Sequence, residues 1–356
     1  MRLRFLTLLR CPGCRARLAL ARSELQEGDD LIEGELACTA CSRPYPVRKG
    51  IPCFVQGEDY AASFGWQWTR FAHLQRDSYN GTHLVRDSIL RRSGWTPEFL
   101  AGKTLLECGC GSGNDTEVLA DLCGTVVSLD LSSAVESQSP DVLKRENVLV
   151  VRADLRAAPF EEGTFDLGYC HRVIQHTPDP RAAFAGMARF VRPGGSFFLH
   201  SYDTHWKSMR HFKYWVRPLI KGWSHERVFR VLKVTGPVLY PLVGALNRIG
   251  GLRRLVKLAL PFENHDRILS KAGCTLTRRE RYEYSLLVTF DDLTPEYDNP
   301  NPPEALAEWF EEQGFIDVEI RGRRPSLVVG VRPADKTVPR PRAPWEAPAA
   351  RAPSTA

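Results

Sequence analysis

Between residues 100 and 132 the chain changes from a short apolar run to a glycine-rich turn and back again. Residues 103–108 form an apolar run typical of a buried strand, and residues 125–129 form a second one that ends at Asp130. The segment between them, 114–121, has helical spacing, with Asn114 or Asp115 as the expected N-cap. The pattern predicts a strand–helix–strand unit with a glycine-rich first turn.

The alternation of apolar runs and polar, helix-forming segments continues beyond this unit. A third strand is expected to end near Asp154, a fourth spans 165–170, and a further strand follows a helix and the Pro-Gly-Gly of 193–195. Near the end of the chain, 302–322 indicates a helix that stops at Gly314 and is followed by a strand, and 326–333 indicates a last strand. Strands that alternate with helices predict the α/β fold class.

The glycines at 109, 111 and 113 let a ligand approach the backbone, and Asp130 at the end of the next strand can accept hydrogen bonds from ribose hydroxyls. Cys108 and Cys110 interrupt this loop, and we interpret them as small side chains in a tight turn because two thiols are too few for a metal site. Domains that bind NAD share the layout, so the loop alone does not identify the nucleotide. Asp115 and Glu117 place acid in the first helical turn, which disfavours phosphate there.

Two Cys-x-x-Cys pairs lie near the N-terminus. Cysteines with this spacing, each pair on a tight turn, can direct four thiolates at one tetrahedral Zn²⁺ ion, which would be structural because no coordination position stays open. Residues 1–57 hold too little apolar material for an independent core, so metal binding would supply folding free energy. The alternative, two redox motifs, lacks the strand–helix context of such motifs. The expected ligands are Cys11, Cys14, Cys38 and Cys41.

The motifs from 100 to 202 resemble those of the class I S-adenosylmethionine-dependent methyltransferases, in their Methyltransf_11-like branch, and residues 1–57 resemble the Trm112-like zinc ribbon. The resemblance implies a Rossmann-like sheet, S-adenosylmethionine as cofactor, and an antiparallel last strand. Glu107 stands where many relatives carry Asp. By resemblance the loop around the methionine part is Glu107, Gly109, Gly111 and Gly113, the ribose lies at Asp130 beside Leu131, the adenine at Asp154 and Leu155, and Cys170 completes the cofactor site.

The same resemblance makes residues 203–300 a helical insertion between the fifth strand and the last helix, at a position over the cofactor pocket. The expected division of the chain is a zinc ribbon at 1–57, a linker with cap helices at 58–99, the cofactor-binding core at 100–202, the insertion as a substrate lid at 203–300, the last helix and two strands at 301–334, and a disordered tail at 335–356.

Methyl transfer to a hydroxyl or a protonated amine needs a base. His171 follows the fourth strand, on the side that faces the methyl group in this fold, and His176 lies in the next loop, so both are candidate catalytic residues. A structural, hydrogen-bonded histidine is the alternative for each. Trp66, Gln67 and Trp68 could cover the cofactor or pack in the core.

The insertion mixes aromatic residues such as Trp206 and Trp215 with a basic set, Arg210, Lys213, Arg217 and Lys221. Helices that pack their aromatic side and solvate their basic side are one interpretation. A basic lid for an anionic amphiphile and a surface for RNA are two others. We expect no membrane or RNA response, with the aromatic side lining a pocket for a soluble or carrier-linked acceptor.

The composition of the whole chain does little to narrow the possible functions. A net charge of +6 over 356 residues permits an anionic partner without requiring one. The apolar run near 5–9 is too short for a secretory signal, and 234–246 is too short for a transmembrane span, so a cytoplasmic protein is expected. The pattern does not predict an oligomeric state.

Three functions remain open at this point. The first is a methyltransferase that acts on O or N of a small molecule, such as a natural-product, sugar or lipid-linked intermediate. The second is an rRNA or tRNA base methyltransferase, which is disfavoured because the insertion is as aromatic as it is basic and no Asn-Pro-Pro-Tyr motif is present. The third is a non-catalytic binding partner, and the intact loop with Asp130 and Asp154 argues against it.

Overall fold

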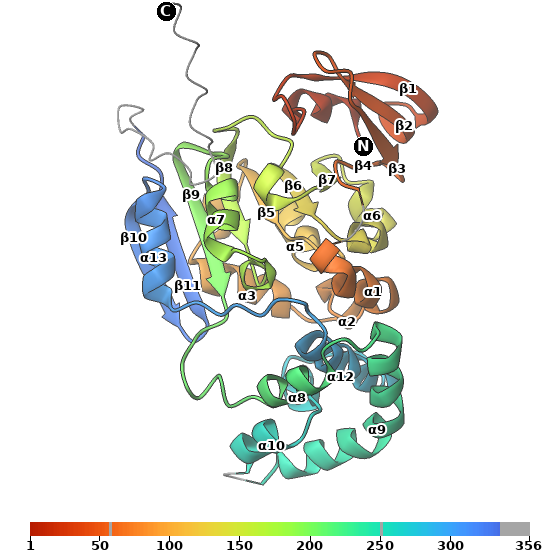
Figure 1. The fold of residues 1–356 in the computed structure, drawn as a ribbon, viewed down its shortest axis with the longest axis vertical. Coiled ribbons are helices and arrows are strands. Elements are labelled where there is room, and N and C mark those ends of the chain that lie inside the picture. Colours follow the sequence, from red (N-terminus) through yellow and green to blue (C-terminus); the bar gives the residue numbers. More distant parts are fainter. Residues whose placement is uncertain (57–58, 250–251, 335–356) are drawn as a thin grey trace, which may run out of the picture.

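A computed structural model of the chain describes residues 1–56, 59–249 and 252–334. The expected tail at 335–356 lies outside the described residues. The described chain contains a four-stranded sheet, a seven-stranded sheet flanked by helices, and a group of helices at the opposite end from the four-stranded sheet (Figure 1).

The seven-stranded sheet has the order β10-β11-β9-β8-β5-β6-β7. The strands from β7 to β9 are parallel, whereas β11 is antiparallel to both β9 and β10. The strands expected from the sequence are confirmed, and the Rossmann-like methyltransferase sheet with them. Their bounds are β5 (Thr104–Cys108), β6 (Thr125–Asp130), β7 (Val148–Arg152), β8 (Phe165–Cys170), β9 (Val191–Ser201), β10 (Ile316–Arg323) and β11 (Ser326–Val331).

The central strands are apolar on both faces because helices cover the sheet on both sides. Adjacent residues such as Leu105 and Leu106 are both fully buried, each in a different hydrophobic cluster. One cluster packs α7 (Pro180–Ala188) and α13 (Pro303–Glu312) against the sheet, and the other packs α3 (Leu84–Ser93) and α5 (Asn114–Leu122). The remaining short elements near the sheet are α4 (Pro97–Leu100), α6 (Pro140–Leu143), η3 (Ser133–Ser137), η4 (Leu155–Ala157) and η5 (Ile174–His176).

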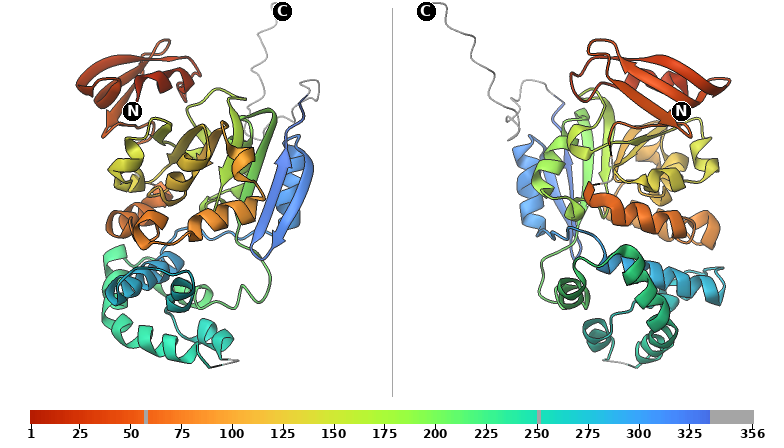
Figure 2. Two further views of the ribbon diagram at one scale, coloured as in Figure 1. Left: turned by 180° about the vertical axis from the view of Figure 1, so that it is seen from behind. Right: turned by 45° about the vertical axis from the view of Figure 1, so that its right-hand side comes forward.

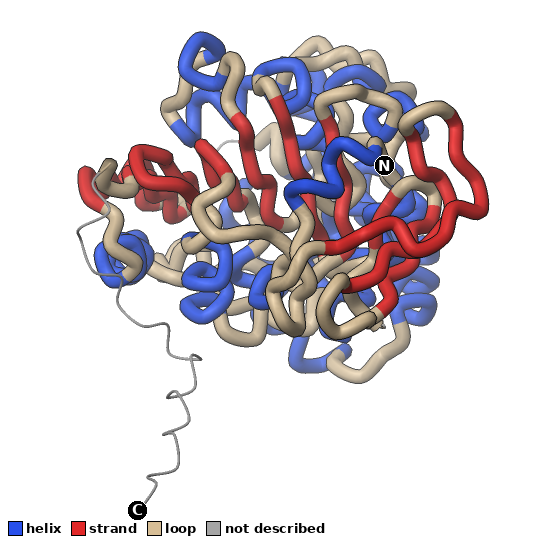
Figure 3. The backbone as a smooth tube through the Cα atoms, turned by 90° about the horizontal axis from the view of Figure 1, so that it is seen from above, coloured by secondary structure: helices blue, strands red, loops and turns tan. Residues whose placement is uncertain are grey.

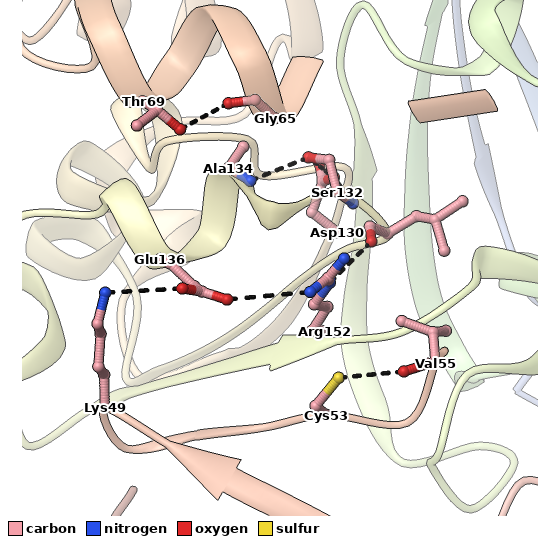
Figure 4. Close-up of polar contacts among 11 residues, drawn as sticks. Lys49, Cys53, Val55, Gly65, Thr69, Asp130, Ser132, Ala134, Glu136 and Arg152 are labelled. Carbon is pink, nitrogen blue, oxygen red and sulfur yellow. Dashed lines mark hydrogen bonds and ion pairs between the residues drawn. The ribbon is translucent and has the colours of Figure 1, made fainter. Parts of the chain in front are cut away.

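The N-terminal sheet docks beside the edge strand β7. It consists of β1 (Leu18–Glu27), β2 (Asp30–Cys38), β3 (Pro44–Arg48) and β4 (Ile51–Pro52), preceded by η1 (Leu3–Leu8). The backbone N–H of Phe54 donates to the Arg152 carbonyl (2.8 Å), and Leu9 is buried in the same cluster as the central sheet. Lys49 and Arg152 both contact the Glu136 carboxylate (3.6 and 3.9 Å), as Figure 4 shows. Figure 3 shows the strands of the two sheets side by side.

The insertion is helical, as expected, and its helices gather around a third hydrophobic cluster. It comprises α8 (Lys213–Ile220), α9 (His225–Leu246), α10 (Arg253–Ala259), α11 (Asp266–Lys271) and α12 (Arg278–Leu293). The cap segment before the core, with η2 (Asp59–Ala61), α1 (Ala62–Phe71) and α2 (Asp77–Asn80), packs on the insertion through Phe71 and Leu74.

Helix α9 extends beyond the apolar run expected at 234–246. By length and composition alone, α9 is long and apolar enough to cross a membrane. It has 22 residues, and an 18-residue window within it has a mean hydropathy of 1.3. In the folded protein 28% of that window is buried. The sequence placed the start of the apolar run at Val234, but the helix begins at His225 and continues through Pro237 and Pro241. Among the described residues this is the one helix that meets these criteria.

Candidate functional site

A cavity of about 700 Å³ lies at the carboxyl ends of β5, β6, β8 and β9. The chain reverses its strand order between β5 and β8, and in doubly wound sheets ligands bind at such a reversal. The cap segment and the insertion close the cavity from the other side. Its walls include Gly109, Asp130, His171, Tyr202, Trp68 and Asp291.

The glycine loop forms the part of the cavity wall that follows β5. Gly109 and Gly113 both have φ of +84°, and a Cβ on Gly109 would lie 2.3 Å from Cγ2 of Val173. Only glycine therefore fits at Gly109 without displacing a neighbour. Gly113, rather than Asn114 or Asp115, occupies the N-cap of α5, and no side chain caps the helix. The expected N-cap was wrong because the Asp115 carboxylate accepts hydrogen bonds from Tyr169 and His171 instead.

Asp130 ends β6 at the cavity, next to Leu131. Its Oδ2 accepts from the Gly111 N–H (2.9 Å) and its Oδ1 accepts from the Ser132 N–H (2.8 Å), so the carboxylate is held in one orientation. Figure 4 shows Asp130 beside Ser132. Leu131 and Leu155 supply apolar wall to the same cavity. A fixed carboxylate with leucine side chains on the same cavity suits a ribose hydroxyl pair attached to a flat apolar base.

Glu107 lies beneath the loop and is 2% exposed. Its Oε2 accepts from the hydroxyls of Thr116 and Ser128, both at 2.6 Å. Burial, together with the nearby Asp115, raises the pKa of Glu107 to about 8. The Glu107 carboxyl is therefore mostly protonated at neutral pH.

Six of the nine expected cofactor residues line the cavity: Glu107, Gly109, Gly111, Asp130, Leu131 and Leu155. Gly113, Asp154 and Cys170 lie beside it without lining it. Asp154 accepts from the Arg156 N–H (2.8 Å) and pairs with its guanidinium (2.6 Å). Cys170 is fully buried, and burial raises the pKa of its thiol. The glycine loop, the fixed Asp130 carboxylate and the leucine side chains together fit S-adenosylmethionine.

His171 is brought to the cavity by the end of β8, but both of its ring nitrogens have partners. Nδ1 donates to Oδ2 of Asp115 (2.6 Å), and Nε2 accepts from Nη1 of Arg92 (3.0 Å). Asp115 also accepts from the Tyr169 hydroxyl (2.8 Å). Burial lowers the pKa of His171 to about 4 against the opposing effect of Asp115. Although burial disfavours its ionised form, the contacts with His171 and Arg172 lower the pKa of Asp115 to about 2.

His176 lies in η5, on the same cavity, with only one nitrogen engaged among the described residues. Its Nδ1 donates to the Tyr297 carbonyl at 3.0 Å. The ring packs between Phe64 and Tyr202, with centroids 5.1 and 5.4 Å away. Burial lowers the pKa of His176, so the imidazole is neutral at pH 7 and Nε2 carries the lone pair.

Charged side chains surround the two histidines. Arg91, Arg92 and Arg172 line one side, and burial lowers the pKa of Arg92 to about 10. Asp291 accepts from Gln67 Nε2 (2.7 Å), and burial raises the pKa of the adjacent Asp292 to about 6. The sequence did not single out Arg91, Arg92, Asp291 or Asp292. The end of the fifth strand could have pointed to Tyr202, but no local signal marks α3 or α12 as cavity walls.

The aromatic residues expected to line an acceptor pocket do not do so. Trp206 and Trp215 are exposed, Phe212 is fully buried in the insertion cluster, and none of the three lines the cavity. The insertion contributes Ile268 of α11 and residues of α12 such as Tyr284 and Leu287 instead. Of the cap residues, Trp68 lines the cavity, whereas Trp66 stacks on Phe290 (4.6 Å between centroids).

The basic set of the insertion is also divided. Lys213 is buried and its Nζ lies 2.9 Å from Oδ2 of Asp298, which Arg217 also approaches (3.6 Å). Arg210 and Lys221 are exposed. The four residues therefore do not form one solvent-facing surface.

The N-terminal cysteines converge on one point. The ligand atoms of Cys11, Cys14, Cys38 and Cys41 all lie within 4.8 Å of one another. The Sγ atoms are 3.7 Å apart for Cys11 and Cys41 and 3.3 Å apart for Cys14 and Cys38. Four thiolates at about 2.3 Å from a tetrahedral Zn²⁺ would have similar separations. The donor set and its geometry fit a structural zinc ion.

Comparison with known proteins agrees with this architecture. A family model described as a methyltransferase domain matches residues 106–199, and one described as Trm112p-like protein matches residues 2–50. A ubiquinone biosynthesis O-methyltransferase of Pseudomonas paraeruginosa strain PA7 is 27% identical over 195 residues, which cover 48% of this chain and 84% of that protein. The protein of the same name from Thiobacillus denitrificans is 35% identical over 113 residues, 31% of this chain and 48% of that one.

Solved structures give more distant matches. The carbon methyltransferase CurJ is 15% identical with a TM-score of 0.37, covering 74% of this chain and 57% of that one. Phosphoethanolamine N-methyltransferase 1 of Haemonchus contortus is 19% identical with a TM-score of 0.34, covering 43% and 34%. The two family matches, the named relatives and the sheet order lead to one conclusion. The chain is an S-adenosylmethionine-dependent methyltransferase with a Trm112p-like domain ahead of its methyltransferase domain.

Proposed function

We propose that this chain transfers a methyl group to an oxygen or nitrogen atom of a small molecule held in the cavity beside the glycine loop. The observation that carries the proposal is the position of His176, a neutral histidine with Nε2 unengaged among the described residues, on the same cavity as Gly109 and Asp130. When bound, S-adenosylmethionine supplies an electrophilic methyl group on a sulfonium. A nucleophile that loses a proton during its attack needs a nearby base.

His176 is the better base of the two candidate histidines. Its Nδ1–H is fixed by the Tyr297 carbonyl, which leaves the lone pair on Nε2. His171 would have to break its contact with Arg92 before Nε2 could accept a proton. We assign His171 a positioning role, in which it holds Arg92 and Asp115 at the wall.

The surrounding side chains suit a small, partly anionic acceptor. Arg92 and Arg172 can fix a negatively charged substituent, and Asp291 and Asp292 can accept from hydroxyl or amine groups. Phe64 and Trp68 close the cap side of the cavity, which helps to exclude water from the transfer. O-methylation of a small molecule is the activity in the names of the relatives, and we extend it to this chain as part of the proposal.

We further propose that Cys11, Cys14, Cys38 and Cys41 hold a structural zinc ion. The ion would have no open coordination position and would take no part in methyl transfer. Its role is to fix the turns of the small sheet that packs on β7.

The proposal can be tested by supplying purified protein with S-adenosylmethionine labelled on the methyl group. Three substrates are compared: a polar metabolite extract, a lipid extract and total RNA from a bacterium. Label should enter a molecule of one of the two small-molecule extracts, with a gain of one methyl group by mass spectrometry. Label in RNA alone would replace the proposal with base methylation, and label in none of the three would refute it.

A further inference from the structure

In contrast to the expectation from the sequence, we propose that the outer side of the insertion docks on the surface of an anionic lipid bilayer. Four apolar side chains follow one face of α9: Val231, Val234, Val238 and Leu242. Their spacing of three and four residues places them on one stripe. Val234 is 74% exposed and Val238 is 68% exposed, among the highest values of any large apolar residue described.

The opposite face of α9 is already occupied. Val228, Leu232, Tyr240 and Val243 are buried against the insertion cluster, with Phe290 of α12 among their neighbours. The helix is therefore part of the folded insertion, with one face inside and one face outside. An amphipathic helix of this kind lies in the plane of a membrane interface, whereas a transmembrane span would have to leave its cluster.

A second apolar strip continues the surface onto the neighbouring helices. Trp215 and Leu219 share a face of α8, and Leu255 and Leu258 share a face of α10. The exposed faces of α8 and α10 adjoin, because Trp215 Nε1 donates to the Leu258 carbonyl at 2.7 Å. In both Figure 1 and Figure 2, α9 and α10 lie at the end of the molecule away from the N-terminal sheet.

The charge of this region identifies the occupant. Residues 206–258 contain 12 Lys and Arg but one acidic residue, Glu226. Taken from totals of 48 and 42, this leaves 36 basic and 41 acidic residues, so the rest of the chain has a net charge of −5. Glu226 accepts from Trp66 Nε1 at 2.8 Å and is thereby engaged. Apolar stripes bordered by unbalanced basic charge match lipid headgroups that carry negative charge.

The flanking cations are available for that contact. Lys221, Arg230 and Lys233 are exposed and make no ion pair with a described residue. Lys213 and Arg217, by contrast, are paired with Asp298 inside the insertion and belong to the fold. The docking surface therefore comprises the α9 stripe, the strip of α8 and α10, and the exposed cations beside them.

Sedimentation with lipid vesicles tests the proposal on the full chain. Wild-type protein should bind phosphatidylcholine vesicles that contain phosphatidylglycerol, and pure phosphatidylcholine vesicles much less. Replacing three exposed cations (Lys221→Gln, Arg230→Gln and Lys233→Gln) should weaken binding to the anionic vesicles about 100-fold at low salt, since each contributes about fivefold. The apolar variant Val234→Gln, Val238→Gln and Leu242→Gln should lose binding more than tenfold at every salt concentration.

Matched controls lie on the N-terminal sheet, at the other end of the molecule. Arg17→Gln with Arg22→Gln and Arg48→Gln removes three exposed cations, and Leu20→Gln with Leu25→Gln removes two exposed leucines. Both controls should bind vesicles as wild type does. Each variant is first checked for an unchanged far-ultraviolet circular dichroism spectrum and for S-adenosylhomocysteine binding, so that misfolding is recognised.

Three results would overturn the proposal. The first is absence of binding by the wild type to anionic vesicles, and the second is equal binding by the two insertion variants. The third is evidence that the surface binds another partner. Such evidence would be wild-type protein that binds RNA but not vesicles and loses RNA binding in the cation variant, or a wild-type dimer that becomes a monomer in the apolar variant. Vesicle binding needs no acceptor, so this test is independent of the proposed methyl transfer.

Discussion

Replacing Gly109 with alanine should lower the free energy of unfolding for two reasons, an unfavourable backbone conformation and a steric clash. Gly109 has φ of +84°, and a Cβ there would lie 2.3 Å from Cγ2 and 2.5 Å from Cγ1 of Val173. The left-handed backbone costs an L-residue roughly 1–2 kcal/mol. Overpacking against the partly buried Val173 side chain adds roughly 1–3 kcal/mol. The free energy of unfolding of Gly109→Ala should therefore fall by about 2–5 kcal/mol, and any relief through movement of the loop should appear as lost S-adenosylhomocysteine affinity.

A second glycine provides the matched control. Gly102 has φ of +73°, but a Cβ there meets no heavy atom within 4 Å. Gly102→Ala should lose only the backbone cost, about 1–2 kcal/mol, with unchanged cofactor affinity. Urea denaturation and calorimetry with S-adenosylhomocysteine measure both quantities. Adding Val173→Ala to Gly109→Ala should recover only part of the packing cost, because the Cβ at position 173 would still lie 2.9 Å from the new Cβ. If Gly109→Ala and Gly102→Ala show the same loss of stability and the same cofactor affinity, the inferred clash between position 109 and Val173 is wrong.

Three further predictions concern the cofactor, the base and the metal. Asp130→Ala should lower S-adenosylhomocysteine affinity about 10- to 150-fold, because hydrogen bonds to a charged group contribute roughly 1.5–3 kcal/mol. NAD should bind to neither the wild type nor the variant. Equal S-adenosylhomocysteine binding by the two proteins in calorimetry would show that Asp130 is not part of the cofactor site. Because the pKa of His176 is lowered from 6.5, kcat/KM should be constant near pH 7 and fall as the pH drops below 6.5; an inflection near 4 would point to His171 instead. Elemental analysis should find one zinc per chain, lost in Cys38→Ser while cofactor binding persists; iron in its place would refute the zinc assignment.

The sequence predicted the sheet more completely than the site. Strands such as β8 were bounded correctly because parallel strands covered on both faces are continuous apolar runs. Gly109, Gly111 and Asp130 lie on one cavity wall, as the sequence indicated, because strand, turn and helix follow one another in a fixed local order. The N-cap of α5 was missed because Asp115 has partners, Tyr169 and His171, that lie 54 and 56 residues away.

Residues that reach the cavity from distant segments carry no local signal. Asp291 lies 224 residues from its partner Gln67, and Tyr297 lies 121 residues from His176. The aromatic and basic stretch after residue 205 was assigned to the cavity because it is near the insertion point in sequence. In three dimensions that stretch forms the outer side of the insertion, and the later helix α12 takes the inner position.

The most direct test of the account compares His176→Asn with His171→Asn in a single-turnover methyl-transfer assay, using the acceptor that labelling identifies. The asparagine amide can keep a donor near the Tyr297 carbonyl but has no basic nitrogen, so the rate of the His176 variant should fall about 10²- to 10⁴-fold with S-adenosylhomocysteine affinity unchanged. The His171 variant should retain the low-pH limb of the wild-type profile, because its role is to hold Arg92 and Asp115. An unchanged rate for His176→Asn, with a loss of that limb in His171→Asn, would contradict the account.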